Sequence, residues 1–266
     1  MKVEDTIKNI ISKSGNDLHI QVEEILKQGK WSVTSSPYYN DPVTGIPRET
    51  DIIARKDWDI HDDFGRNKRG MLRIRLFIEC KFLSDPIVLW LKDKNIDKAK
   101  ALAKDNPILR DKEDHYLTDT SKIPNKIHHY FENNQVINQW SNKDHKDPLF
   151  EAMSGCLNAF IYYHRAGLEN HAETINYPII IVNDLSKLYG RDRSQLGASV
   201  ITDNQQLETS YSYREVNNQY KMQYFLIDVV GYNKFKDFLS KLENNDIDIL
   251  RRILYWQLNP INQNND

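Results

Sequence analysis

Hydrophobic and polar positions alternate along residues 71–82. One face of this segment is apolar and consists of Leu72, Ile74, Leu76, Ile78 and Cys80. The opposite face consists of Arg73, Arg75, Phe77, Glu79 and Lys81. A period of two is typical of a β-strand, whose successive side chains point to opposite sides. The pattern predicts a strand with one face in the core and the other available for chemistry.

A second strand is predicted over residues 50–55, where β-branched residues surround Asp51. The connection between the two strands is polar and contains Gly65 and Gly70, as hairpin loops commonly do. We therefore predict an antiparallel pair that brings Asp51 close to Glu79 if the register is right.

The rest of the chain predicts an α/β fold in a single domain of 266 residues, with a central mixed sheet flanked by helices. A helix at 17–27 and a strand at 31–34 precede the hairpin. After the hairpin come an apolar run at 87–91, a helical insertion at 95–139, a helix at 147–165, a buried strand at 177–182, a polar and aromatic loop at 190–220, a strand at 223–230, and helices at 233–242 and 247–258.

Asp51, Glu79 and Lys81 combine two carboxylates with an ammonium group. Hard divalent cations prefer carboxylate, carbonyl and water oxygens, and a lysine can offset negative charge that develops at a phosphate. An acid-x-Lys triplet occurs about once by chance in a charged chain of this length. The other copy, at 144–146, lies in a polar run without a strand pattern. The alternative is that both acids are solvated at strand ends and that Lys81 pairs with one of them.

The segment GIPRETDIIA at 45–54, followed by FIECK at 77–81, resembles the PD-(D/E)XK, or restriction-endonuclease-like, superfamily. The resemblance covers the N-terminal third of the chain and rests on architecture alone beyond it. It implies a restriction-endonuclease-like core. It also implies that Asp51, Glu79 and the main-chain carbonyl of Cys80 hold Mg²⁺ or Mn²⁺, and that Lys81 orients or deprotonates the attacking water.

The first predicted helix departs from the family pattern. Many members carry there a glutamate that contacts the metal shell, and alignment on Leu18 and Val22 puts His19 in that position. Glu23 lies one turn later on the same helix face and is the candidate substitute, with Glu24 as a weaker choice. The alternative for Glu23 is a solvated carboxylate.

A formal net charge of −2 and a pI near 6.5 argue against a protein that coats nucleic acid through bulk positive charge. DNA contact therefore requires a local patch. One candidate patch leads along the hairpin toward Glu79 and consists of Arg66, Lys68, Arg69, Arg73 and Arg75. A second lies in the loop at 190–220 and consists of Arg191, Arg193 and Arg214, interleaved with Tyr211 and Tyr213. The alternatives are a solubilising hairpin tip and an ordinary half-buried hairpin.

The histidines, the cysteines and the absence of targeting signals bear on metal binding and cellular location. The adjacent His128 and His129 point apart on a helix, so a surface or partly buried role is predicted for them rather than metal binding. Cys80 and Cys156 make no disulfide framework, and neither a signal peptide nor a membrane-length apolar run is present. We expect a cytoplasmic protein without membrane association.

The sequence favours a metal-dependent DNA endonuclease, in a setting such as bacterial or phage DNA defence that the resemblance implies. The alternative is a catalytically silent or partner-gated DNA-binding subunit that keeps the nuclease fold. Degenerate copies usually lose the acid or the lysine, and here all three residues remain. A small-molecule phosphohydrolase would lack its Gly-rich phosphate loop. The sequence leaves a homodimer open, and it favours residues 95–139 as the docking surface of an activating partner protein, if there is one.

Overall fold

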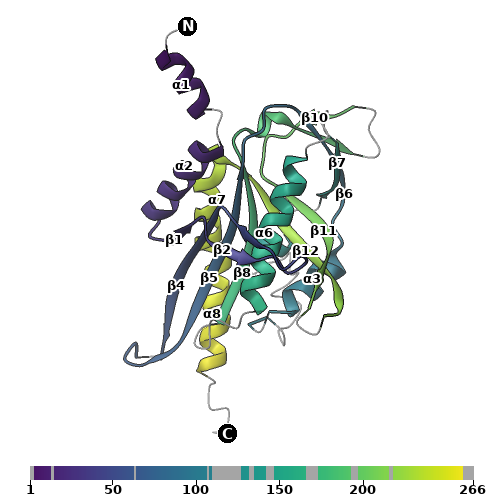
Figure 1. The fold of residues 1–266 in the computed structure, drawn as a ribbon. Helices are drawn as coiled ribbons and strands as arrows, with labels where there is room; N and C mark the ends of the chain where they lie inside the picture. The colour runs from purple at the N-terminus through teal and green to yellow at the C-terminus, as the bar shows by residue number, and fades with distance from the viewer. Residues whose placement is uncertain are drawn as a thin grey trace.

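Ten strands of the described chain form one mixed β-sheet in a computed structural model of the protein (Figure 1). The structure describes residues 3–12, 15–62, 64–106, 108–109, 127–131, 135–141, 147–165, 173–192, 197–215 and 218–259. In sheet order the strands are β1 (Ser32–Ser35), β4 (Ile52–His61), β5 (Lys68–Lys81), β8 (Glu173–Val182), β12 (Tyr220–Gly231), β11 (Gln205–Arg214), β7 (Gln135–Ser141), β6 (Ile87–Asp93), β9 (Leu188–Asp192) and β10 (Ser199–Val200). Two short strands, β2 (Tyr38–Asn40) and β3 (Pro47–Glu49), form a separate antiparallel pair.

β5 joins a local hairpin to a distant part of the chain. It is antiparallel to β4, where Ile52 pairs with Ile78, and parallel to β8, where Ile78 pairs with Ile179. At the hairpin turn the backbone N of Gly65 donates to the carbonyl of Asp62 at 2.9 Å. Gly65 has a φ of 66°, in the left-handed region that favours glycine. The predicted antiparallel pair and its turn are therefore confirmed.

Helices cover both faces of the sheet (Figure 1). On one face α6 packs against β5 and β8, around a core that includes Phe77 and Leu149. On the other face α2, α3, α5, α7 and α8 pack against β4, β5 and β12, around a core that includes Ile78 and Ile179. The helical elements are α1 (Val3–Ser12), α2 (Gly15–Gln28), α3 (Ile96–Lys104), α5 (His128–Phe131), α6 (Pro148–Arg165), η1 (Leu185–Lys187), η2 (Tyr232–Lys234), α7 (Phe235–Lys241), the π-helix η3 (Leu242–Ile247) and α8 (Asp248–Leu258). No helix in the described part of the chain is long and apolar enough to cross a membrane.

The structure confirms the apolar face predicted on the helix at 147–165. Ala152, Cys156 and Ala159 of α6 are fully buried, and Phe160 and Tyr163 pack against the same core. The predicted strands at 177–182 and 223–230 lie within β8 and β12, and the two C-terminal helices are α7 and α8. Strong local periodicity therefore located these elements correctly.

The helical insertion predicted at 95–139 is partly wrong. α3 and α5 are helical, but β7 is a strand between β6 and β11 in the central sheet. Val136 and Ile137 are buried there, while the residues after them are mostly polar and mask the strand pattern. Pairing on both sides overrides the local composition. Residues 107, 110–126 and 132–134 of this segment lie outside the described residues.

The loop predicted at 190–220 is wrong for much of its length. β10, β11 and the end of β9 lie there, and β11 pairs with β12 from Gln205 opposite Val229 to Arg214 opposite Tyr220. The polar composition of this segment favoured a loop, but polar residues such as Gln206 occupy buried positions in β11. Polar residues at buried positions hide a strand from a reading based on hydrophobic pattern.

Candidate active site

Asp51 and Glu79 meet at one end of the β4–β5 hairpin. Asp51 directly precedes β4, and the pairing of Ile52 with Ile78 brings it opposite Glu79. The Oδ2 atom of Asp51 accepts a hydrogen bond of 2.7 Å from the backbone N of Cys80. A carboxylate that accepts from a backbone N–H is held in one orientation. The structure thus brings together the two acids that the sequence singled out.

Glu79 is a buried carboxylate, only 5% exposed. Its Oε1 accepts a hydrogen bond of 2.9 Å from the Thr50 hydroxyl, and its Oε2 lies 3.8 Å from the Lys81 Nζ. Burial, and then the charge of Asp51, raise the pKa of Glu79 to about 8, and Lys81 and Thr50 offset this only in part. A bound cation would favour the ionised forms of both acids.

Helix α6 closes the face around Glu79. A Cβ at Gly155 would lie 2.6 Å from the Glu79 Oε1, so only glycine lets the helix backbone pass this close to the carboxylate. Phe77 and Arg75, on the same strand face, are buried as well. The prediction that this whole face is available for chemistry is therefore wrong, because a helix distant in sequence covers it. At the end of this face Glu79 lines a cavity, and Lys81 keeps a quarter of its side chain exposed.

The oxygen donors at this end suit a cation that keeps most of its water. Among the described residues, no group of three or more His, Cys, Asp or Glu side chains is arranged to hold a metal ion. Asp51 and Glu79 supply two carboxylates, and the carbonyl of Cys80 lies next to Glu79 in the same strand. Mg²⁺ usually binds few protein ligands and several waters. The residues present fit Mg²⁺ or Mn²⁺ held in that manner.

Glu23 of α2 lies at the edge of this site. Its carboxylate is 3.1 Å from the His19 Nε2 and accepts a hydrogen bond from the Ser35 hydroxyl. Ser35 pairs with the first residue of β4, directly after Asp51. Burial opposes ionisation of Glu23, but hydrogen bonds from Lys27 and Ser35 outweigh it and lower the pKa. Glu23 thus favours its ionised form, and it stays the predicted helix ligand.

The basic hairpin tip lies at the far end of the hairpin from Glu79. Arg69 precedes Glu79 by ten residues in β5, which corresponds to about 34 Å in an extended strand. Arg66 and Arg69 are exposed at the tip, and the Lys68 Nζ lies 2.6 Å from a carboxylate oxygen of Asp59. These side chains form a basic surface at the far end of the hairpin.

Arg73 and Arg75, two members of the predicted DNA-binding patch, make contacts within the protein. Arg73 donates two hydrogen bonds to Asp57, of 2.7 and 2.8 Å. Arg75 is 6% exposed, and its guanidinium lies 5.4 Å from the ring centroid of Tyr163. Burial lowers the pKa of Arg75 to about 10. The predicted DNA contact is wrong for Arg75 because α6 covers it.

The second basic group is dispersed. The guanidinium of Arg191, in β9, lies 4.7 Å from the ring centroid of Trp90. Arg214 is exposed at the end of β11, and Arg193 lies outside the described residues. The tyrosines that alternate along β11 belong to the buried core or its margin. These tyrosines therefore belong to an ordinary half-buried hairpin.

A cavity of about 520 Å³ adjoins Glu79 between α6 and the β2–β3 pair. Asp41, buried in the loop after β2, fixes these elements to each other. Its Oδ2 accepts from the Arg48 Nε at 2.8 Å and from the Asn158 Nδ2 at 3.1 Å. Its Oδ1 accepts from the backbone N of Val43 at 2.8 Å. The cavity therefore has walls that are held in place by a buried carboxylate.

Two residues that position Glu79, namely Thr50 and Gly155, were not identified from the sequence. The contact of Thr50 with Glu79 depends on the strand register, which the sequence left open. Gly155 lies inside the predicted helix at 147–165, where glycine costs about 1 kcal/mol relative to alanine. That cost is the signal that could have identified a close approach at Gly155.

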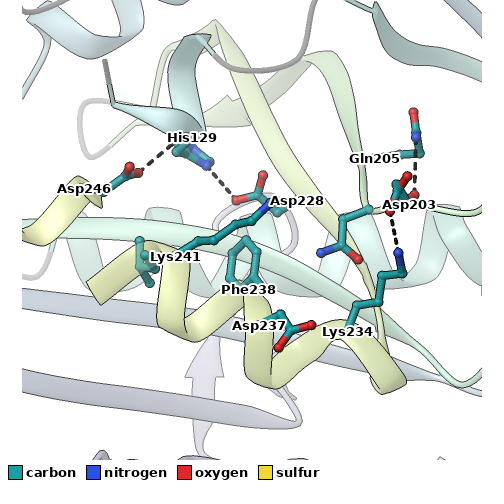
Figure 2. A pocket seen from close by; sticks show the side chains of 11 residues that line it. His129, Asp203, Gln205, Asp228, Lys234, Asp237, Phe238, Lys241 and Asp246 are labelled. Atoms are coloured by element: carbon teal, nitrogen blue, oxygen red, sulfur yellow. Dashed lines mark hydrogen bonds and ion pairs between the residues drawn. The ribbon is translucent and has the colours of Figure 1, made fainter. Parts of the chain in front are cut away.

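A second cavity, of about 350 Å³, lies on the other face of the sheet under α7 (Figure 2). The His129 Nδ1 lies 2.7 Å from the Asp228 Oδ2, and the backbone N of His129 donates to Asp246 at 3.2 Å. Asp228 is in register with Ile179, whose side chain belongs to the core opposite Glu79. His129 is therefore a buried partner of Asp228, not a surface residue, and this cavity is separate from the candidate active site.

No protein-family model matches the chain, and no match is found among curated proteins or solved structures. The described fold is an α/β arrangement with a large mixed sheet and helices on both faces. The resemblance to the PD-(D/E)XK superfamily stays a prediction that rests on the residues of the hairpin.

Proposed function

We propose that the chain is a metal-dependent nuclease that hydrolyses phosphodiester bonds of DNA at Asp51, Glu79 and Lys81. The observation that supports this most strongly is the convergence of two acids from adjacent strands beside a lysine. Burial and the charge of Asp51 raise the pKa of Glu79, so the pair is poorly neutralised by the protein alone. Such perturbed acids cluster at functional sites.

The residues have distinct roles in this proposal. Asp51, Glu79 and the Cys80 carbonyl would hold Mg²⁺ or Mn²⁺, and Glu23 of α2, at the edge of the site, is the candidate further acid. When bound, the ion supplies Lewis-acid polarisation of a phosphoryl oxygen and a water of lowered pKa. Lys81 lies 3.8 Å from Glu79 and keeps a quarter of its side chain exposed, so its ammonium can orient the attacking water and offset charge at the phosphate.

Cleavage of supercoiled plasmid and of single-stranded DNA tests the proposal, with Mg²⁺, Mn²⁺ or EDTA present. We expect metal-dependent nicking or linearisation, reduced about a hundredfold or more by Glu79→Gln or Lys81→Met. Glu173→Gln and Lys221→Met make the same chemical changes at exposed positions and should retain wild-type rates. Cleavage that survives both site substitutions in folded protein would overturn the assignment.

A catalytically silent or partner-gated DNA-binding subunit is the second candidate. One observation favours it: within the described residues no set of three metal-ligating side chains converges, so cation binding depends on further oxygens from substrate or a partner. A gel shift in EDTA discriminates the two. Salt-sensitive binding without cleavage under any metal condition would favour the subunit.

A further inference from the structure

The cavity beside Glu79 is a groove between a helix and a hairpin. The face of α6 that carries Glu151 and Gly155 forms one wall, and Arg48 and Glu49 of β3 form the other. Glu79 itself belongs to the lining. A ligand in this groove can therefore reach a proposed catalytic carboxylate.

The volume of the groove limits the size of the group that can bind in it. Its volume of about 520 Å³ lies in the range of small-molecule sites. A base inside a duplex is stacked and paired, and it reaches the interior of a groove of this size only after it leaves the stack. A single unpaired base is therefore the part of a nucleic acid that this space can admit.

The charge of the groove determines whether the base or the phosphate of a nucleotide binds in it. Glu49 and Glu151 are exposed carboxylates in its lining, and the cation of the lining, Arg48, is paired with Asp41, so the net negative charge repels phosphates. Carboxylates accept hydrogen bonds from exocyclic amino groups, such as the cytosine N4 amine. Phe150 is 53% exposed and also lines the groove, which offers a ring for stacking. The lining is thus suited to a base and unsuited to a backbone.

The groove is preformed. Asp41 is 4% exposed and ties the loop after β2 to Arg48 and Asn158. The Asn158 Oδ1 in turn accepts a hydrogen bond of 2.9 Å from the Tyr211 hydroxyl. A cavity whose walls are fixed by buried hydrogen bonds does not need to be ordered at the moment of binding.

We infer that this groove takes one unpaired base with an exocyclic amino group beside the phosphate that is cleaved, and that Glu151 accepts from that amino group. The inference rests on the proposed nuclease function. It assigns a substrate class, single-stranded or locally unpaired DNA, and a base preference. Thymine is disfavoured because it presents carbonyl oxygens where adenine and cytosine present amino groups.

Cleavage of single-stranded oligo(dC), oligo(dA) and oligo(dT) of equal length tests the preference, with a fully paired duplex for comparison. We expect oligo(dC) and oligo(dA) to be cut about tenfold faster than oligo(dT), and the duplex to be cut slowest. Glu151→Gln adds an amide donor that can satisfy thymine, so it should bring the ratio of rates for dC and dT toward one. Glu173→Gln should leave the ratio unchanged. Equal rates on all substrates would overturn the inference and leave the nuclease assignment intact.

A binding measurement separates failure of this inference from failure of the proposed function. Fluorescence anisotropy in EDTA compares labelled oligo(dC) with oligo(dT) on wild type and on Glu151→Gln. If no metal supports cleavage but oligo(dC) binds about tenfold tighter and Glu151→Gln removes the difference, the groove binds a base and the nuclease assignment fails. Equal binding of both oligonucleotides without any cleavage would reject both.

Discussion

Replacement of Gly155 by alanine would push a methyl group against the carboxylate of Glu79. The new Cβ would lie 2.6 Å from Oε1 and 2.8 Å from the carboxyl carbon. Ordinary contact begins near 3.4 Å, so Glu79 or the helix must retreat by about 0.8 Å. Glu79 cannot simply rotate away at no cost, because its Oε1 accepts a hydrogen bond from Thr50 in a buried setting.

Two opposing effects determine the stability of Gly155→Ala. Insertion of a methyl group into a packed region costs about 1–3 kcal/mol. Alanine in place of glycine inside a helix contributes about 1 kcal/mol in the other direction. The net loss is therefore about 0–2 kcal/mol, which the fold can tolerate. Activity should suffer more, because displacement of a catalytic group by about 1 Å costs on the order of a hundredfold.

The assay combines the plasmid nicking rate with urea unfolding of the same preparations. Gly15→Ala is the matched control, since Gly15 begins α2 and no atom lies within 4 Å of a Cβ built there. We expect Gly15→Ala to keep the wild-type rate. A folded Gly155→Ala protein that nicks plasmid at the wild-type rate would refute the idea that α6 fixes the working position of Glu79.

Three further predictions concern single contacts. Thr50→Val removes a hydrogen bond to buried Glu79 and should lower the free energy of unfolding by about 1–3 kcal/mol, measured by urea unfolding; an unchanged midpoint would contradict this. Asp228→Ala leaves buried donors unpaired and should lower the free energy of unfolding by about 1–3 kcal/mol. Metal-dependent cleavage should persist, because the second cavity lies on the other face of the sheet. Loss of cleavage in folded protein would argue against that separation. Hydrogen bonds from Arg73 lower the pKa of Asp57 in the folded protein. At pH values above the ordinary aspartate pKa, the ion pair therefore stabilises the fold by about 0.2–1 kcal/mol. This stabilisation is lost as the pH falls through the lowered pKa. The Tm difference between wild type and Asp57→Asn should shrink on acidification, and a constant difference would be inconsistent with this linkage.

Local patterns were sufficient to predict the hairpin and α6. The strands of the hairpin are neighbours in sequence, and both their alternation and their turn residues are visible in the chain. The convergence of Asp51 and Glu79 follows from that local pairing. The apolar spacing along α6 also appears in the chain, and the structure confirms it.

Long-range contacts explain what the sequence could not predict. Glu208 of β11 is buried because Lys92 and Tyr224, from other strands, satisfy its carboxylate. Gln206 is buried beside it, and its Oε1 accepts a hydrogen bond of 2.6 Å from Lys94. Such partners make polar residues acceptable in a buried strand, and they are invisible in a local window. The burial of Arg75 under α6 has the same origin.

The pairing of β5 with β4 on one side and β8 on the other also sets an order of events in folding. Partners in the hairpin are tens of residues apart or fewer, whereas Leu72 of β5 pairs with Glu173 of β8, roughly a hundred residues later. Closing the longer loop costs more chain entropy, and non-local pairing forms slowly. Pulse-labelled hydrogen exchange should therefore show β4–β5 amides protected before those of β8, and simultaneous protection would contradict this order. Asp51 and Glu79 then come together while still exposed to water, and the burial of Glu79 beneath α6 is a late step.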